Sequence, residues 1–302
     1  MLTFPINMIS IEGPDLSGKT TLIDDIHKKT NYQWHLMDRS KLSRMVFAKM
    51  YDRDVNQATR EFYEEVSNLN NRYVFLMPTF EMLKERYGHR GDKIHTIETL
   101  KKSYDLFFDE FANHPRLSNV YGIMNGASNR LCNMVVDYHN CIESHLNLKE
   151  ISGQVQNFVK HFPNKECNQL TFTLHDDGGF KESNIDSLSV ESEKEYYNRI
   201  YESLMNKIDD EQSGKNPYSR KEGLDSRRYI FTDDTCISMI HVLNRNSVLD
   251  IRFVCRSTDI NNKFENDLRF LYFIASECWS LLGEGCNFCR MHFTLNSAHI
   301  LE

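Results

Sequence analysis

The sequence predicts an α/β protein, in which a parallel sheet flanked by helices is followed by a smaller α+β domain. Short apolar runs alternate with helical stretches through the first half of the 302 residues, which is typical of βαβ units. A glycine-containing loop separates the first run from the first helical stretch. In the last third, two alternating apolar runs flank a polar turn, which predicts a β-hairpin.

In the first half, strands are expected at residues 8–11, 34–37, 73–76 and 120–124. Helices are expected between them, at residues 20–29, 41–51 and 58–69. Because helices separate these strands, the strands are expected to run parallel. In such a sheet, ligands bind at the carboxyl ends of the strands.

The second half has a different pattern. Residues 150–190 are rich in Asn, Asp and Ser, which predicts a linker followed by peripheral structure. A helix is expected at 191–208, a hairpin at 237–243 and 249–254, and a buried apolar helix at 270–282. We therefore divide the chain into a first domain at 1–148, a linker region at 149–189 and a second domain at 190–302.

Composition narrows the class of protein. The chain is 40% apolar and has 13 Gly and 6 Pro, so it can build a core and is not of low complexity. It has no apolar run of about 20 residues and no signal-peptide pattern at its start, so we expect a cytoplasmic protein without membrane contact. A net charge of −7 disfavours nucleic acid as a partner, and the 8 cysteines are expected to be reduced thiols.

One motif carries the strongest functional signal. The segment from Gly13 to Thr20 fits the pattern G-x-x-x-x-G-K-[ST] between a predicted strand and a predicted helix. Its backbone N–H groups are expected to hold the phosphates of ATP, with Lys19 on the β and γ phosphates and Thr20 on Mg²⁺. The alternative is a glycine-rich turn with a chance lysine. The expected ATP-binding residues are Gly13, Ser17, Gly18, Lys19, Thr20 and Thr21.

Five further residues accompany this loop. Asp15 lies within it, Asp38 and Arg39 follow the second predicted strand, and Arg86 and Arg90 follow the third. With them the first half resembles the thymidylate kinase and deoxynucleoside kinase family of P-loop phosphotransferases. The resemblance implies that Asp15 contacts the nucleotide sugar, that Asp38 and Arg39 lie by the transferring phosphate, and that the two later arginines belong to a lid. The alternatives are a surface ion pair and a solvated helix end. The acceptor stays open.

The second half resembles the thymidylate synthase and deoxypyrimidylate hydroxymethylase family. The interval from Cys236 to Arg256 matches the family's spacing between its nucleophile and a phosphate-binding arginine. The resemblance makes Cys236 the nucleophile that attacks the pyrimidine ring. It also implies that Asp267 reads a cytosine edge, unless the neighbouring Asn266 holds that place. The implied nucleotide-binding residues are Arg227, Arg228, Arg256, Ser257, Asp267 and His299.

These resemblances leave three functions open. The first is a pyrimidine deoxynucleotide kinase fused to a nucleotide-binding domain. The second adds transfer of a methyl or hydroxymethyl group from methylene-tetrahydrofolate by Cys236, and the third makes the second domain a non-catalytic module for dimerisation or sensing. Read alone, Cys236 is a buried structural thiol. We expect a homodimer formed through the second domain, and such a fusion would suit a virus acting in its host's cytoplasm.

Overall fold

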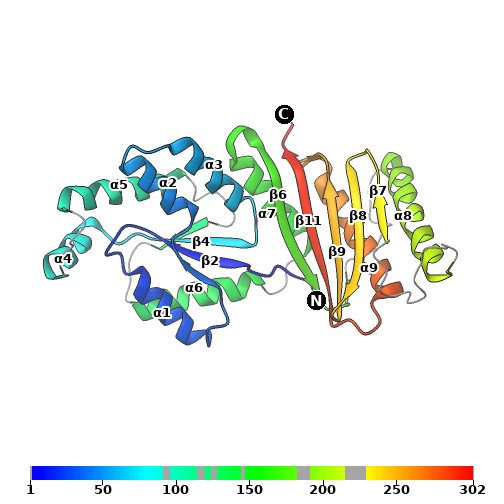
Figure 1. The fold of residues 1–302 in the computed structure, drawn as a ribbon, viewed down its shortest axis with the longest axis horizontal. Coiled ribbons are helices and arrows are strands. Elements are labelled where there is room, and N and C mark those ends of the chain that lie inside the picture. Colours follow the sequence, from blue (N-terminus) through cyan, green and yellow to red (C-terminus); the bar gives the residue numbers. More distant parts are fainter. Residues whose placement is uncertain are drawn as a thin grey trace. The chain divides into compact units, whose positions relative to one another are not determined.

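The computed structural model describes residues 2–90, 96–113, 120–123, 128–143, 147–181, 191–214 and 229–301. The chain is of the α/β class and forms two compact units (Figure 1). The N-terminal unit is Ile6–Ile142, and the C-terminal unit combines Met1–Pro5 with Glu143–Glu302. The second unit was expected to be the smaller one, but it is the longer of the two because it includes the segment interpreted as a linker.

The N-terminal unit is built on a four-stranded parallel sheet with the order β3-β2-β4-β5. Its strands are β2 (Met8–Glu12), β3 (Leu36–Asp38), β4 (Asn71–Leu76) and β5 (Val120–Ile123), which confirms the four predicted strands. The central strand β2 pairs with β3 on one side and with β4 on the other. In this register Ile11 lies opposite Asp38, and Glu12 lies opposite Phe75. The carboxyl ends of three strands therefore meet at one edge.

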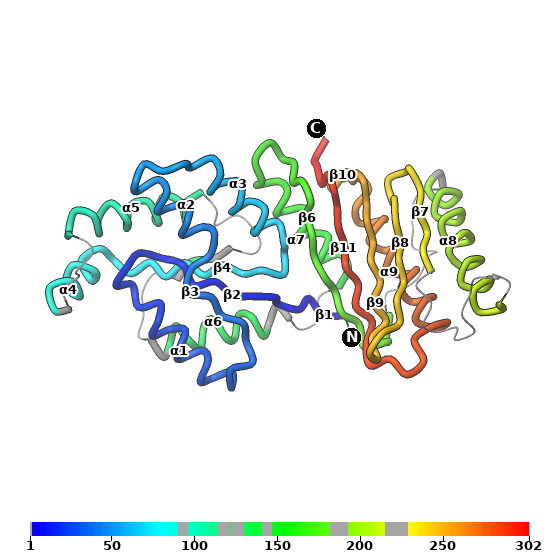
Figure 2. Tube along the Cα trace, in the orientation of Figure 1, coloured from blue at the N-terminus to red at the C-terminus, as the bar shows by residue number. Residues whose placement is uncertain are grey.

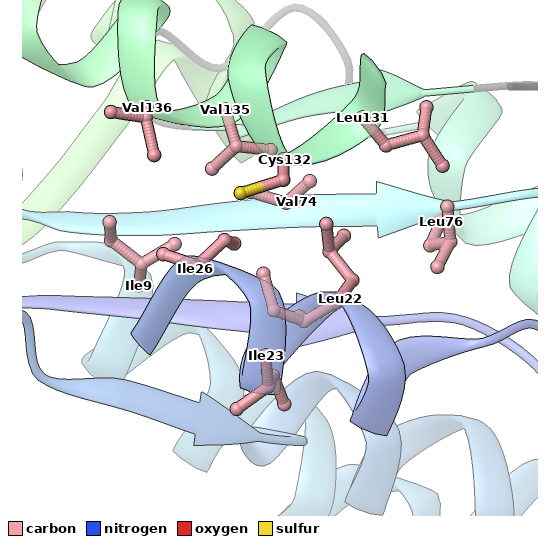
Figure 3. Packing of buried hydrophobic residues seen from close by; sticks show 11 residues of the cluster. Ile9, Leu22, Ile23, Ile26, Val74, Leu76, Leu131, Cys132, Val135 and Val136 are labelled. Atoms are coloured by element: carbon pink, nitrogen blue, oxygen red, sulfur yellow. The ribbon is translucent and has the colours of Figure 1, made fainter. Parts of the chain in front are cut away.

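Helices cover both faces of this sheet, and successive side chains of β4 pack against them on alternate faces. On one face, α1 (Lys19–Lys29) and α6 (Ser128–Glu143) pack against Val74 and Leu76 in the core cluster of Figure 3. On the other face, Tyr73 contacts Phe62 of α3 (Val55–Val66), and Phe75 contacts Phe111 of α5 (Ile97–Asn113). Helix α2 (Lys41–Met50) packs on α3 and α5, and α4 (Phe80–Arg90) follows β4.

The C-terminal unit has a seven-stranded mixed sheet, with the strand order β1-β6-β11-β9-β8-β7 and β10 beside β11 (Figure 2). The predicted hairpin is present as β8 (Ile237–Arg245) and β9 (Val248–Cys255), which pair antiparallel. Strand β9 also pairs in parallel with β11 (Phe288–His299), and the intervening helix α9 (Phe264–Leu282) packs on both. The remaining strands are β1 (Leu2–Thr3), β6 (Glu166–Asp176), β7 (Ile230–Thr232) and β10 (Thr258–Asp259).

The structure corrects the interpretation of residues 149–189 as a linker and peripheral structure. Helix α7 (Leu148–His161) occupies the start of this segment, and its apolar residues recur at helical spacing and are buried. Strand β6 follows, after a 3-10 turn at Pro163–Lys165, and pairs with both β1 and β11. The buried apolar side chains of β6 are Cys167, Leu170, Phe172 and Leu174, and the polar residues between them are more exposed. The polar composition hid this alternation.

Two helices of the C-terminal unit are longer than expected. Helix α8 (Glu191–Gln212) lies beside β7, and α9 begins at Phe264 rather than near Phe270. The first turn of α9 is acidic, which favours a helix start but interrupts the apolar run used for the prediction. In the part of the chain that the structure describes, no helix is both long and apolar enough to cross a membrane.

Candidate functional site

Residues 13–18, here called the phosphate loop, connect β2 to α1 at the carboxyl edge of the sheet. Gly13 has a φ of +140°, and a Cβ there would lie 2.4 Å from the carbonyl oxygen of Leu76. Only glycine allows this approach of the loop to β4. Gly18 is the N-cap of α1, with a φ of +98°, and it places no side chain over the helix end. The first-turn N–H groups of α1 have no acceptor within the helix, so they can bind an anion.

The loop also contains a buried polar atom that fits a phosphate ligand. Ser17 is only 4% exposed, and its Oγ has no hydrogen-bond partner among the described residues. A buried hydroxyl without a partner is destabilising, and a phosphate oxygen would supply one. Thr20 and Thr21 are exposed in the first turn of α1, where the hydroxyl of Thr20 is available to Mg²⁺. The loop residues expected to bind ATP therefore lie together around the start of α1.

Lys19 is the first residue of α1 and is buried under the loop. Its Nζ donates hydrogen bonds of 2.9 Å and 2.8 Å to the carbonyl oxygens of Gly13 and Pro14. Burial lowers the pKa of this ammonium, and the nearby carboxylate of Asp15 partly opposes that shift. The loop therefore holds the ammonium group through two of its own carbonyl oxygens. Phosphate oxygens would compete with these carbonyl oxygens for the ammonium group.

Two arginines from other segments reach the same loop. Nη1 of Arg86, in α4, donates hydrogen bonds of 2.8 Å and 2.9 Å to the carbonyl oxygens of Leu16 and Ser17. Arg39, after β3, forms an ion pair with Asp15, and its guanidinium lies 4.8 Å from the centre of the Phe47 ring. The structure therefore brings Lys19, Arg39 and Arg86 together around the phosphate loop. The side chain of Arg90, the second predicted lid arginine, lies outside the described residues.

The turn that carries Arg39 has an unusual backbone. Asp38 ends β3 with an exposed side chain, and Arg39 follows with a φ of +81°, in the left-handed region. A non-glycine residue pays roughly 1–2 kcal/mol for this conformation. Glu12, which the sequence analysis missed, is fully buried and accepts a hydrogen bond of 2.6 Å from the N–H of Ser40. The sequence pattern that could have indicated Glu12 is a charged residue at the end of an apolar strand.

In the C-terminal unit, the structure brings Cys236 and Arg256 together. The N–H of Arg256 donates a hydrogen bond of 2.8 Å to the carbonyl oxygen of Cys236, where β8 begins and β9 ends. Cys236 is half-buried, Arg256 is exposed, and Ser257 beside it is half-buried. The expected cysteine, arginine and serine are therefore neighbours with access to solvent. Arg227 and Arg228 lie outside the described residues.

Asp267 lies in the first turn of α9 and is buried. The hydroxyl of Tyr197 donates a hydrogen bond of 2.7 Å to its carboxylate. Burial raises the pKa of Asp267 to about 6, although the tyrosine hydrogen bond lowers it. The adjacent Tyr196 accepts the N–H of Ile237 at 2.9 Å, so neighbouring tyrosines of α8 contact Asp267 and the residue after Cys236.

The last expected residue, His299, ends β11. Its carbonyl oxygen accepts a 2.9 Å hydrogen bond from Ile260, and its ring lies beside Ser297. Of the two cysteines of a C-x-x-C pair, Cys286 lies in the turn between α9 and β11 and Cys289 lies in β11 itself. Among the described residues, no group of three His, Cys, Asp or Glu side chains could hold a metal ion.

Comparison with known proteins gives distant likenesses only. No family model and no curated protein matches the chain. The Bacillus subtilis YorR protein, solved in complex with phosphorylated GDP, is 16% identical over 47% of this chain and 100% of its own, with a TM-score of 0.39. Thymidylate synthase from T4 phage is 17% identical over 32% of this chain and 34% of its own, with a TM-score of 0.22. At these values neither likeness assigns the chain to a family.

Proposed function

We propose that the N-terminal unit is a phosphotransferase that uses ATP and Mg²⁺ and acts on a pyrimidine deoxynucleotide. One observation carries the proposal: Lys19, Arg39 and Arg86 come from three segments and all contact the phosphate loop. Phosphoryl transfer needs little covalent chemistry from side chains, because it depends on positioning and on positive charge around the phosphoryl oxygens. The first-turn N–H groups of α1, together with three cations beside the loop, meet that need.

Each residue has a defined part in this reaction. The loop amides and Lys19 would bind the β and γ phosphates, for which Lys19 exchanges its carbonyl partners for phosphate oxygens. Thr20 would hold Mg²⁺, which neutralises phosphate charge when it is bound. Arg39 and Arg86 would stabilise the charge on the transferring group, with Asp38 beside them, and Asp15 would orient Arg39 or contact the sugar of the nucleotide.

The acceptor is proposed from the sequence resemblance to deoxynucleotide kinases. The test is to incubate the protein with ATP, Mg²⁺ and each deoxynucleoside monophosphate in turn and to measure ADP and the diphosphate product. Lys19→Ala should abolish turnover, while Lys28→Ala, which removes an exposed cation from the same helix, should not. A DNA oligonucleotide is included as an acceptor. Absence of ADP with every acceptor would reject the function.

A second activity is favoured by the exposure of Cys236. Most described cysteines are buried, whereas Cys236 is half-buried and joined to Arg256. Methyl or hydroxymethyl transfer from methylene-tetrahydrofolate to C5 of a pyrimidine nucleotide requires a nucleophile that its substrate can reach, and Cys236 would supply it. Release of tritium from 5-tritiated deoxyuridylate or deoxycytidylate tests this activity. The same release from Cys236→Ser would reject it.

If the C-terminal unit binds nucleotide without turnover, it acts instead as a sensing or dimerising module. Binding of deoxyuridylate or deoxycytidylate with no tritium release would identify that role. In either case Arg256, Ser257, Asp267 and His299 are the proposed ligand-binding residues, together with Arg227 and Arg228. We propose a homodimer formed by this unit in the cytoplasm, which sedimentation of the intact chain would test.

A further inference from the structure

Glu12 is a buried carboxylate that the proposed chemistry does not use. It ends β2, immediately before the phosphate loop. Its Oε1 accepts a 2.6 Å hydrogen bond from the N–H of Ser40, and its Oε2 accepts one from the hydroxyl of Ser43. A buried carboxylate is costly unless hydrogen bonds compensate it, and burial raises the pKa of Glu12. Its two partners indicate what the carboxylate does.

The partners of Glu12 adjoin Arg39. Ser40 follows Arg39 directly and caps α2, since its hydroxyl accepts a 3.1 Å hydrogen bond from the N–H of Leu42. The N–H of Arg39 itself donates to the carbonyl oxygen of Ile11 at 3.4 Å. Successive residues of β2 therefore hold successive N–H groups of the turn. A non-glycine residue such as Arg39 keeps a left-handed backbone conformation only where surrounding contacts of this kind hold it.

The side chain of Arg39 depends on the same contacts. Its guanidinium lies over the ring of Phe47, and Phe47 belongs to α2, whose first turn is bonded to Glu12 through Ser40 and Ser43. From this surface the guanidinium reaches Asp15 in the phosphate loop. We propose that Glu12 is a positioning residue, which holds Arg39 in its left-handed conformation and so directs the guanidinium onto the phosphate loop. Its catalytic consequence rests on the proposed phosphotransfer.

The first experiment measures the position of Arg39 without any assay of activity. Phenylglyoxal modifies accessible arginines, and peptide mass spectrometry gives the rate at Arg39. We expect Glu12→Ala to raise that rate about fivefold by freeing the turn. Glu12→Gln should stay within about twofold of wild type, since its amide oxygen still accepts from Ser40 and its NH₂ group can donate to Ser43.

A matched control separates this effect from general loosening of the unit. Glu110 is also buried and is also linked to α2, through an ion pair with Lys49 at the opposite end of that helix. Glu110→Ala should destabilise the unit and leave the labelling of Arg39 unchanged after comparison at equal fractions folded. Equal labelling of Arg39 in wild type and Glu12→Ala would overturn the inference, as would an equal increase in Glu110→Ala.

The second experiment is a double-mutant cycle on turnover. We expect Glu12→Ala to lower kcat at least about tenfold, and to change kcat less than about twofold when Arg39→Ala is already present. Additive losses would contradict a role through Arg39. If the wild-type protein forms no ADP with any acceptor, the proposed function fails, and the labelling experiment still decides the role of Glu12.

Discussion

Arg86 and Ser17 are joined by a 2.9 Å hydrogen bond from Nη1 of the arginine to the carbonyl oxygen of the serine. The same nitrogen donates to Leu16, and it would lie 3.7 Å from a Cβ at Gly18. Helix α4 and the phosphate loop are distant in sequence, so this bond sets the arginine beside the start of α1. A guanidinium there is near the first-turn N–H groups that we propose as the phosphate site.

We expect Arg86→Gln to lower kcat about 100-fold, which corresponds to about 2.7 kcal/mol of lost transition-state stabilisation. Binding of ATP should weaken less, because the loop amides and Lys19 remain. Steady-state formation of ADP and equilibrium binding of ATP measure the two effects separately. Lys84→Ala removes an exposed cation from the same helix and should have little effect. Similar losses in both variants would mean that only the net charge of α4 matters.

Gly13 provides a second prediction, about stability. A methyl group at this position would meet the backbone oxygen of Leu76 at 2.4 Å, and the φ of +140° is unfavourable for alanine. We expect Gly13→Ala to lower the free energy of unfolding of the N-terminal unit by about 1–3 kcal/mol and to abolish ATP binding. Urea denaturation measures the first effect, and calorimetric titration measures the second.

Gly88 offers the matched control for that substitution. It lies in α4, and a Cβ there would meet no atom within 4 Å. Alanine is the better helix former by roughly 1 kcal/mol, so Gly88→Ala should leave the stability equal or higher. Equal destabilisation of the two variants would show that the loop does not pack against β4 as described.

The strands of the N-terminal unit and the residues of the phosphate loop were predictable because both depend on local pattern. Four apolar runs, each followed by polar residues, mark strands that end at one edge, and the glycines mark the loop. The contacts of Arg86 with the loop were not predictable in detail. They depend on how α4 leaves β4, which no local spacing encodes.

Two failures have different physical causes. Strand β6 was read as peripheral because half of its side chains face away from the core and are polar, so composition outweighed a real alternation. Glu12 was missed because its structural role depends on hydrogen bonds to Ser40 and Ser43, which are distant from it in the sequence. The left-handed conformation of Arg39 was equally invisible, since arginine has no preference for it.

Thiol labelling tests the site of the C-terminal unit. Of the seven cysteines whose surroundings the structure describes, five are buried, so among these seven iodoacetamide should modify the half-buried Cys236 and Cys286 first. If a pyrimidine nucleotide binds beside Arg256, deoxyuridylate or deoxycytidylate should slow the labelling of Cys236 about tenfold and leave that of Cys286 unchanged. Mass spectrometry of the labelled peptides gives both rates. Equal protection of the two thiols, or none, would contradict binding at Cys236.

His139 predicts how the stability of the N-terminal unit depends on pH. Burial lowers its pKa to about 4, against the effect of a 2.7 Å hydrogen bond from its Nδ1 to the carbonyl oxygen of Val135. Between pH 6.5 and pH 4 the unfolded chain therefore binds a proton that the folded unit does not. His139 by itself should lower the free energy of unfolding by about 3 kcal/mol as the pH falls through this window.

The chain allows that change to be measured in one unit. Of the two tryptophans, Trp34 lies with its ring centre 5.5 Å from that of His139, and Trp279 belongs to the other unit. Fluorescence of a Trp279→Phe protein during urea denaturation at a series of pH values thus reports on the unit of His139. His139→Gln keeps a donor for Val135 and should remove the contribution of His139 to the pH dependence between pH 6.5 and pH 4. Glu12, whose pKa is raised, contributes the opposite slope in both proteins and cancels in their difference, so parallel pH profiles would show that His139 is not held neutral.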